Sequence, residues 1–314
     1  MDGLHDAATD LVVEALHAAR VPVFRMDTAQ FPREVELRGR HDGTGAWSGT
    51  LATSHRSVEL TDIRAVYWNR PNQVVFPDLS ESDAHWARGA ARIGLGGILT
   101  GLAAGWSRWM NHPSRAAAAE FKPEQLRVAS NVGFDTPRTL ITNSSGAVIE
   151  FAKGTGRPIV TKPMGIPYVA HESIGVETVF TRVVDLGDLN GIETTAHLFQ
   201  EWIEGAFEIR LFSIGGTCHS VRIDAHSEAA CLDWRTDYDA LSYSAIATPK
   251  AISDAVGTYM TAMRLTYAAF DFIARPDGTW TFLEANPSGQ WAWPNDQYPL
   301  ANAIADTLNG WCTF

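Results

Sequence analysis

The sequence predicts a mixed α/β protein of two or three packed subdomains, and three observations carry this prediction. A length of 314 residues with 45% hydrophobic and 10% aromatic residues suits a globular chain that buries more than one core. Over the first two-thirds of the chain, strand-like runs of β-branched and aromatic residues alternate with helical patterns. The last third begins again with strand patterns.

Composition and charge narrow the classes of function. A formal net charge of −11 argues against a nucleic-acid partner and favours a neutral or basic peptide. Cys218, Cys231 and Cys312 have no paired spacing, which predicts a reducing compartment. The acidic N-terminus lacks the apolar segment of a signal peptide, and the apolar run Ile93–Trp106 is too short to span a bilayer. We therefore expect a cytoplasmic protein with no membrane partner.

The first hundred residues have the pattern of a small α/β domain. We expect a helix over Leu11–Ala19 followed by strand-like segments at Val21–Met26, Glu34–Leu37, Ala46–Ser54 and Ala65–Trp68. The last of these ends at Arg70, facing a cleft, and Arg70 could be a cation of a domain interface or a ligand. Ser82–Met110 then predicts one or two helices, capped at Ser82 or Asp83. We expect their tryptophans, Trp86, Trp106 and Trp109, in the core.

A second part begins at Asn111-His112-Pro113, because Pro113 disfavours helix at His112. We expect a helix over Ser114–Asn131, containing Lys122 and closed by Gly133, then a strand, a turn and a helix at Thr136–Thr142, Asn143–Gly146 and Ala147–Ala152. Ile159–Lys162 is a β-branched run that ends in a second lysine. Met164–Gly175 follows, and its glycine, proline and histidine residues suit a mobile loop. Lys122 and Lys162 could clamp phosphates or be unrelated surface lysines.

The third part alternates apolar and charged residues. His197–Ile203 and Phe207–Ile214 are strand patterns, and the second puts Glu208 and Arg210 on one face. Thr217–Asp224 should pair with Phe207–Ile214 across Gly215-Gly216, and we expect Arg222 to share the polar face. Solvated edge residues are the alternative explanation of these charges. Asp233-Trp234-Arg235 lies in a loop-like region, and Ile252–Thr266 predicts a helix.

The stretch from Phe270 to Trp293 carries most of the functional signal. Asp277-Gly278 favours a tight hairpin between Phe270–Arg275 and Thr279–Glu284. If Arg275 pairs with Trp280, then Asp271 lies opposite Glu284, and Asn286 shares their face. Two opposed carboxylates need a positive charge between them, and hard oxygen ligands suit Mg²⁺ carrying nucleotide phosphates. The alternative is two solvated acids on an exposed hairpin.

Taken in order, these motifs resemble the ATP-grasp superfamily and, more narrowly, the ATP-grasp ribosomal peptide maturases, or graspetide synthetases, with their microviridin-type ligases. The resemblance covers nearly the whole chain. It rests on Asn111-His112-Pro113, Lys122-Pro123-Glu124-Gln125-Leu126, Gly133, Thr136-Pro137-Arg138-Thr139, Glu284-Ala285-Asn286-Pro287-Ser288-Gly289-Gln290-Trp291, and, near the N-terminus, Arg25-Met26-Asp27 and Arg70-Pro71.

The resemblance implies an α/β (α+β) ATP-grasp fold with a pre-ATP-grasp domain over 1–112, a central subdomain over 113–196 and a C-terminal antiparallel-sheet subdomain over 197–314. ATP would lie in the cleft between the last two. Lys122 and Lys162 would hold its phosphates, and Glu208 would hold the ribose hydroxyls. The adenine edge would meet a hinge formed by Gln200, Glu201, Trp202 and Ile203.

The same resemblance implies a metal site and a reaction. Asp271, Glu284 and Asn286 would bind Mg²⁺, usually two ions, between the β- and γ-phosphates. Arg210, Arg222 and Arg235 would stabilise the transferred phosphoryl group or hold the acceptor carboxylate. The carboxylate would be an Asp or Glu side chain of a ribosomally made precursor peptide with leader and core segments, joined to a Ser, Thr or Lys of the same peptide.

Several points stay open at this stage. Met164–Gly175 is our candidate for the loop that closes over the acyl phosphate. Asp233, His219 and His226 are candidate general bases, the leader-binding residues are not identifiable, and the resemblance suggests a homodimer. An ATP-grasp ligase of the glutathione-synthetase or glutamate-adding type, acting on small molecules or a protein C-terminus, would share every ATP residue. A nucleotide-binding homologue without turnover is the third alternative.

Overall fold

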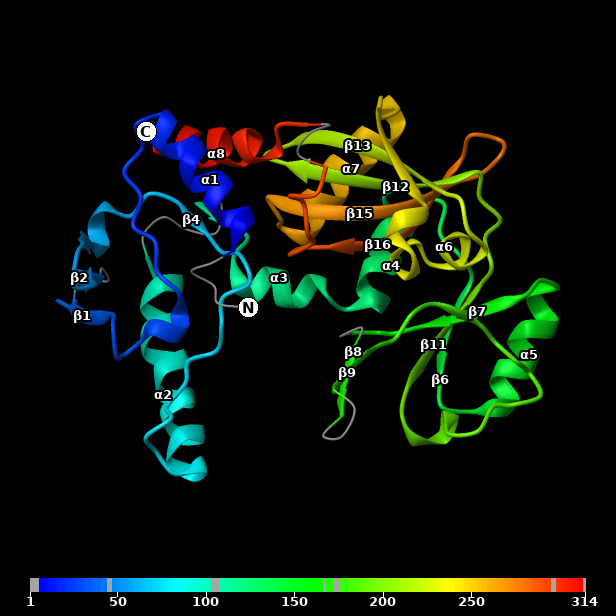
Figure 1. Ribbon diagram of the computed structural model, residues 1–314, viewed down its shortest axis with the longest axis horizontal. Coiled ribbons are helices and arrows are strands. Elements are labelled where there is room, and N and C mark those ends of the chain that lie inside the picture. The colour runs from blue at the N-terminus through cyan, green and yellow to red at the C-terminus, as the bar shows by residue number, and fades with distance from the viewer. Residues whose placement is uncertain are drawn as a thin grey trace.

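The computed structural model describes residues 6–43, 47–102, 108–165, 168–171, 175–294 and 298–312 (Figure 1). Of the expected features, Trp106 and parts of the runs 93–106 and 164–175 lie outside these residues. In the part of the chain that the structure describes, no helix is long and apolar enough to cross a membrane. The prediction of a mixed α/β architecture is confirmed.

The N-terminal part combines two small sheets with two helices. Strands β1 (Glu36–His41), β2 (Trp47–Ala52) and β3 (Ser57–Glu59) form one antiparallel sheet, and β4 (Val66–Tyr67) runs parallel to β5 (Trp109–Met110). Helix α2 (Glu81–Thr100) packs its Leu95 and Ile98 into the local core. Helix α1 (Ala7–Ala18) instead lies beside α8 (Leu300–Gly310) in Figure 1, and Val12 and Leu16 pack with residues of α8.

The central part has a four-stranded antiparallel sheet in the order β10-β7-β11-β6, covered on one face by α5 (Ser145–Thr155). Its strands are β6 (Thr139–Thr142), β7 (Ile159–Lys162), β10 (Arg182–Val183) and β11 (His197–Glu201). A separate two-stranded hairpin contains β8 (Tyr168–His171) and β9 (Gly175–Thr178). Residues alternate along β7, so Ile159 packs toward α5 while Lys162 lies on the opposite face.

The last part is built on a five-stranded antiparallel sheet in the order β14-β13-β12-β15-β16. These strands are β12 (Phe207–Ile214), β13 (Thr217–Ala225), β14 (Leu241–Ile246), β15 (Tyr267–Ala274) and β16 (Trp280–Asn286). Helices α4 (Lys122–Asn131) and α7 (Lys250–Met263) cover one face, where Phe270, Phe272 and Phe282 are fully buried. Helices α1 and α8 cover part of the other face. The remaining helices are α3 (Pro113–Ala119), α6 (Glu228–Leu232) and the 3₁₀ turns η2 (Thr28–Gln30), η3 (Leu60–Asp62), η5 (Ile192–Thr194), η6 (Trp234–Thr236) and η7 (Tyr238–Ala240).

Some expected elements are wrong. Val21–Met26 is not a strand, because Val21 and Val23 pack into one core while Phe24 and Met26 pack into another, so the segment bridges two cores instead of pairing. The helix expected over Ser114–Asn131 is two helices, α3 and α4, because Pro123 belongs in the first turn of a helix and not in its interior.

The prediction of one or two helices over Ser82–Met110 is wrong at both ends. Ser80, not Ser82 or Asp83, caps α2, and Trp109–Met110 forms β5. Trp109 is buried as expected, whereas Trp86 is 76% exposed on α2. A tryptophan is therefore a poor sign of burial on a helix that has one free face.

Candidate functional site

The hairpin β15–β16 brings its two acids together. Asp271 pairs directly with Glu284, and Asn286 pairs with Ala269 on the same face, so this prediction is confirmed. The strand register near the turn differs from the predicted one, because Trp280 pairs with Ala274 and not with Arg275. A β-bulge between Asp271 and Phe272 leaves one extra residue on β16 and restores the opposition of the carboxylates.

Each of the two opposed carboxylates has a cation of its own. Lys122, the first residue of α4, donates a hydrogen bond from Nζ to Oε2 of Glu284. Arg210 on β12 pairs with Asp271 and donates from Nη1 to both carboxylate oxygens at 2.7 Å. The Arg210 side chain is only 9% exposed, and its Nε has no partner among the described residues. A buried guanidinium with spare donors suits an anion.

The charges shift the pKa values of both acids. Burial would raise the pKa of Glu284, but Lys122 and Lys162 outweigh that effect and hold it well below its ordinary value. Burial raises the pKa of Asp271, which Arg210 opposes and Glu284 reinforces. Asp271 is therefore the acid that would gain more from a nearby metal cation.

The donor set of this hairpin fits Mg²⁺. Mg²⁺ is usually held by one or two carboxylates together with substrate phosphates and waters, not by a complete cage of protein ligands. Asp271 and Glu284 supply two carboxylates and Asn286 an amide oxygen on one face. No group of three or more His, Cys, Asp or Glu side chains in the described ranges could hold a metal alone. Phosphates would have to complete the coordination of an ion here.

Lys162 reaches this cluster from the central sheet. It ends β7, and its charge acts on Glu284 while Glu284, Lys122 and Asp271 act on it. Burial lowers the pKa of Lys162 to about 8, and Lys122 adds to this shift. The two lysines predicted to act together are therefore close to the same carboxylate, although they lie on different elements.

The predicted hinge joins the central sheet to β12. Gln200 is buried and donates to the hydroxyl of Thr139 at 3.0 Å, and Glu201 accepts from the Arg138 backbone N–H at 3.0 Å. The Trp202 N–H donates to the Pro158 carbonyl at 2.8 Å. Ile203 is buried, and no described residue accepts a hydrogen bond from its backbone N–H. That N–H is free to meet an acceptor on a planar ligand.

Glu208 follows the hinge and lies on the same face of β12 as Arg210. Burial raises the pKa of Glu208 to about 8, and the charges of Asp271 and Asp233 add to the rise. Hydrogen-bond donors, such as the hydroxyl groups of a ligand, would favour the ionised form of this carboxyl group.

Arg235 forms an ion pair with Asp233, whose carboxylate is buried. Asp233 accepts from Nε at 2.8 Å, from Nη2 at 2.6 Å and from the Arg235 backbone N–H at 3.2 Å. A fourth hydrogen bond comes from the backbone N–H of Thr181, in the central part, at 3.0 Å. The Arg235 side chain is 33% exposed, and its charge acts on Asp271, Glu284, Glu208 and Lys162. Arg235 thus borders the same charged cluster.

Arg222 is not part of this cluster, and the expectation that it shares the polar face is wrong. In the register of β12 and β13, Arg222 pairs with Ile209 and Arg210 pairs with Val221. Directly paired residues point to the same face, so Arg222 and Arg210 point to opposite faces. Arg222 forms an ion pair with Asp224 and lies 4.0 Å from the ring centre of Phe207.

The candidate bases differ in their surroundings. Asp233 already accepts four hydrogen bonds, and although burial would raise its pKa, Arg235 lowers it below the ordinary value, which makes Asp233 a weak base. Burial lowers the pKa of His219, whose Nε2 has no partner among the described residues. His226 shares a hydrogen bond of 2.9 Å with the hydroxyl of Ser242.

Two residues that support the site, Asn111 and Gln125, carry no role in the sequence interpretation, whereas Arg70 was expected at a domain interface or as a ligand. Asn111 donates to the carbonyls of Tyr267 and Pro287, and Gln125 both donates to and accepts from the backbone of Ala285. Arg70 donates to the carbonyl of Ser288. Asn111 and Gln125 are buried polar residues inside recognisable motifs, and that burial is the signal that sequence alone does not show.

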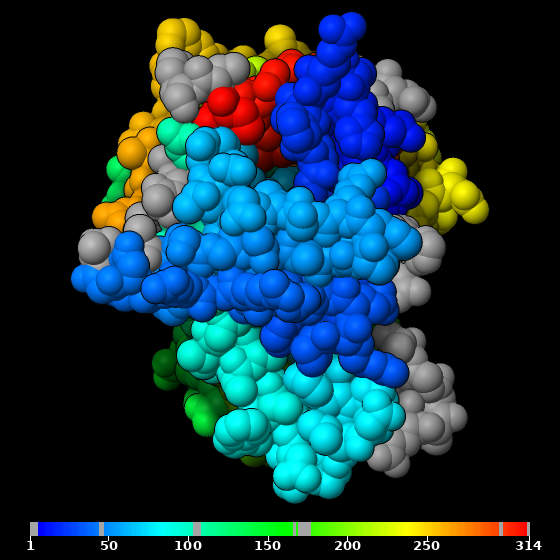
Figure 2. Space-filling view, turned by 90° about the vertical axis from the view of Figure 1, so that its left-hand side faces the viewer, coloured from blue at the N-terminus to red at the C-terminus, as the bar shows by residue number. Residues whose placement is uncertain are grey.

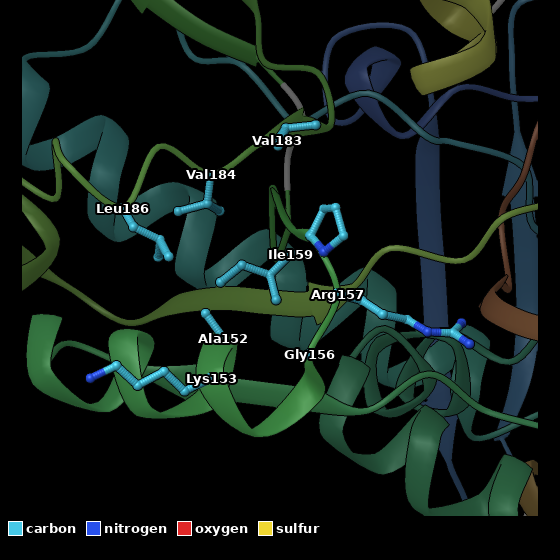
Figure 3. Close-up of a pocket in the computed structure, with 9 residues that line it drawn as sticks. Ala152, Lys153, Gly156, Arg157, Ile159, Val183, Val184 and Leu186 are labelled. Carbon is cyan, nitrogen blue, oxygen red and sulfur yellow. The ribbon is translucent and has the colours of Figure 1, made fainter.

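A pocket of about 390 Å³ lies elsewhere, between α5, β7 and the segment after β10 (Figure 3). Its lining is mostly apolar, from residues such as Ile159, Val184 and Leu186, and Lys153 and Arg157 extend away from it. Ile159 lies on the face of the sheet opposite Lys162. The pocket is therefore separate from the charged cluster.

Known proteins share this architecture. Residues 5–112 match the family model of the MvdD pre-ATP grasp domain. The macrocyclase MdnC of Microcystis aeruginosa MRC, solved with precursor peptide MdnA, is 25% identical over 99% of this chain and 98% of its own, with a TM-score of 0.85. No curated protein sequence matches the chain.

Two further structures are similar. A Chryseobacterium gregarium RiPP-associated ATP-grasp ligase, in complex with ADP and a leader and core peptide, is 25% identical over 99% of this chain and 95% of its own, with a TM-score of 0.89. The ATP-grasp ligase PsnB, complexed with minimal precursor, Mg and ADP, is 22% identical over 98% and 95%, with a TM-score of 0.75.

The fold is therefore the ATP-grasp fold, preceded by a pre-ATP-grasp domain. Within that class, the chain resembles the ligases and macrocyclases that modify ribosomal peptides, along nearly its whole length. The resemblance inferred from the motifs of the sequence is confirmed.

Proposed function

We propose that this protein is an ATP-dependent ligase that activates Asp or Glu side chains of a ribosomally made precursor peptide and closes ester or amide crosslinks within that peptide. One observation carries the proposal. The opposed carboxylates of Asp271 and Glu284 meet Lys122 and Lys162 from the preceding part of the chain, in a fold shared with peptide-modifying ATP-grasp ligases. This arrangement suits the phosphate end of a bound nucleotide.

The roles of the residues follow from their charges and places. Lys122 and Lys162 hold the phosphates as point charges. Asp271, Glu284 and Asn286 would hold two Mg²⁺ ions, which would neutralise charge on the β- and γ-phosphates. Gln200, Glu201, Trp202 and Ile203 border the adenine, supported by the free Ile203 N–H, and Glu208 receives the ribose hydroxyls.

The reaction has two steps. An oxygen of the peptide carboxylate attacks the γ-phosphorus, the bond to the β-phosphate oxygen breaks, and an acyl phosphate and ADP result. A hydroxyl or amine of the same peptide then attacks the carbonyl carbon, loses its proton and expels inorganic phosphate, which leaves an ester or amide. Arg210 and Arg235 stabilise the phosphoryl group in transfer or orient the acceptor carboxylate, because a guanidinium fork matches either group.

Mass spectrometry tests the proposal. The protein is incubated with ATP, Mg²⁺ and the short peptide encoded beside it, and each ring should lower the peptide mass by one water. ATP-dependent modification of a small molecule or of a protein C-terminus would instead favour the glutathione-synthetase or glutamate-adding type. Binding of nucleotide with no phosphate release and no mass change for any candidate peptide would favour a homologue without turnover.

Three further features belong to the same proposal: the division of the chain, its location in the cell and its oligomeric state. We keep the division into 1–112, 113–196 and 197–314, and a cytoplasmic location, which the three free cysteines support. A homodimer is supported by Trp86 and Ile93, which are seven residues apart on α2 and 76% and 67% exposed. Helix α2 is the cyan lower part of the face in Figure 2. Replacing Trp86 and Ile93 by glutamate should convert a dimer to a monomer, as measured by light scattering.

A further inference from the structure

Three successive backbone carbonyls after β16 are each held by a side chain from elsewhere in the chain. Asn111 donates to the Pro287 carbonyl at 2.8 Å, and the Tyr267 hydroxyl donates to the Gly289 carbonyl at 2.6 Å. Between them, Arg70 donates to the Ser288 carbonyl from Nε at 3.1 Å and from Nη2 at 3.0 Å. The loop 287–289 is therefore clamped at every carbonyl, and the middle clamp comes from the N-terminal part.

This loop begins immediately after Asn286 and is connected to it. The Ser288 N–H donates to Oδ1 of Asn286 at 2.9 Å, so the residue whose carbonyl Arg70 holds also orients that amide through its N–H. Gly289 lies against Arg210, because a Cβ added there would come within 2.7 Å of Nη2. Movement of the loop would thus disturb both the amide oxygen and the guanidinium that pairs with Asp271.

Arg70 occupies an unusual backbone conformation, with a φ of 41°. Residues with a side chain pay a conformational cost in this left-handed region, which the surrounding structure must offset. In this conformation Arg70 donates two hydrogen bonds to the carbonyl of Ser288. Of the two roles that the sequence left open for Arg70, the contact with Ser288 supports that of an interface cation. The interface continues into the loop that follows the proposed metal ligand Asn286.

Because it rests on the proposed function, the inference concerns the same metal site. We propose that Arg70 is a positioning residue for this site, and that the N-terminal domain completes the site by fixing Ser288 and, through it, the Oδ1 atom of Asn286. Arg70 itself touches neither metal nor nucleotide. Residues that orient metal ligands typically change metal affinity by about 10- to 100-fold when removed.

Calorimetric titration with ADP, in excess Mg²⁺ and in EDTA, tests this role without requiring turnover. Arg70→Ala should weaken ADP binding about tenfold in Mg²⁺ and leave binding in EDTA unchanged. Arg70→Lys, which keeps the charge and one donor, should give an intermediate loss and serves if the alanine variant does not fold. Tyr67→Phe is the matched control, because the Tyr67 hydroxyl accepts from Nε1 of Trp291, which lies farther along the chain from Asn286 than Ser288 does.

The outcomes are distinct. Equal weakening in Mg²⁺ and in EDTA, or the same small effect for Arg70→Ala and Tyr67→Phe, would reduce Arg70 to an interface contact and overturn the inference alone. Wild-type protein whose ADP affinity does not depend on Mg²⁺ would overturn the metal site of the proposed function and this inference with it. A Mg²⁺-specific loss for both Arg70 variants, absent from Tyr67→Phe, establishes the positioning role.

Discussion

Replacing Asp233 with asparagine should loosen Arg235 without removing any group that touches substrate. Asparagine keeps one acceptor oxygen, and whichever way its amide is turned, its NH₂ group faces two of the four donors, one of them on the guanidinium. A hydrogen bond to a charged group contributes about 1.5–3 kcal/mol, and we take about 2 kcal/mol because the Arg235 side chain is 33% exposed. This loss corresponds to as much as about 30-fold in the population of the aligned guanidinium.

A double-mutant cycle on kcat/KM for peptide modification measures this effect. If Asp233 acts through Arg235, then Asp233→Asn should cost up to about 30-fold in wild type and nothing further in an Arg235→Ala background. Asp237→Asn, which changes a neighbouring acid bonded to the Ser227 hydroxyl, is the control and should have little effect. Losses that simply multiply in the double variant would refute the reasoning and assign Asp233 an independent role.

Three more predictions follow from the site. Burial lowers the pKa of Lys162 to about 8, so its ammonium group loses its proton as the pH rises through 8. The KM for ATP in steady-state assays should therefore rise over this pH range, and Lys162→Arg should remove this pH dependence. Asp271→Asn should lower ATP-dependent phosphate release at least about 100-fold, whereas Asp277→Asn in the exposed turn of the same hairpin should not. Gly289→Ala should lower the free energy of unfolding by about 1–3 kcal/mol in denaturant titrations, because the added Cβ would overlap Ala269 and Arg210. Gly257→Ala, on an open face of α7, should not lower the free energy of unfolding.

The face on which Arg222 lies follows from the turn between β12 and β13. Gly215-Gly216 is a two-residue turn, and both glycines have positive φ, 56° and 92°. Such a turn pairs Ile214 with Thr217, and the register then places Arg222 opposite Ile209. Alternation along a single strand gave Glu208 and Arg210 a common face, but a face shared between strands depends on register.

By itself, the sequence determined the local patterns and the motif order of this protein. Period-two alternation placed Asp271 and Glu284 on hairpin strands, and the Asp277-Gly278 turn brought those strands together, because these features depend on neighbours along the chain. The order of the motifs was enough to predict the ATP-grasp fold.

Only the tertiary structure decided how those pieces support one another. The β-bulge sets the final register by a shift of one residue. The hydrogen bonds to loop 287–289, and the hydrogen bond from the Thr181 N–H to Asp233, join residues that are far apart in the sequence. These hydrogen bonds involve backbone groups, which every residue possesses, so no side-chain pattern in the sequence predicts them.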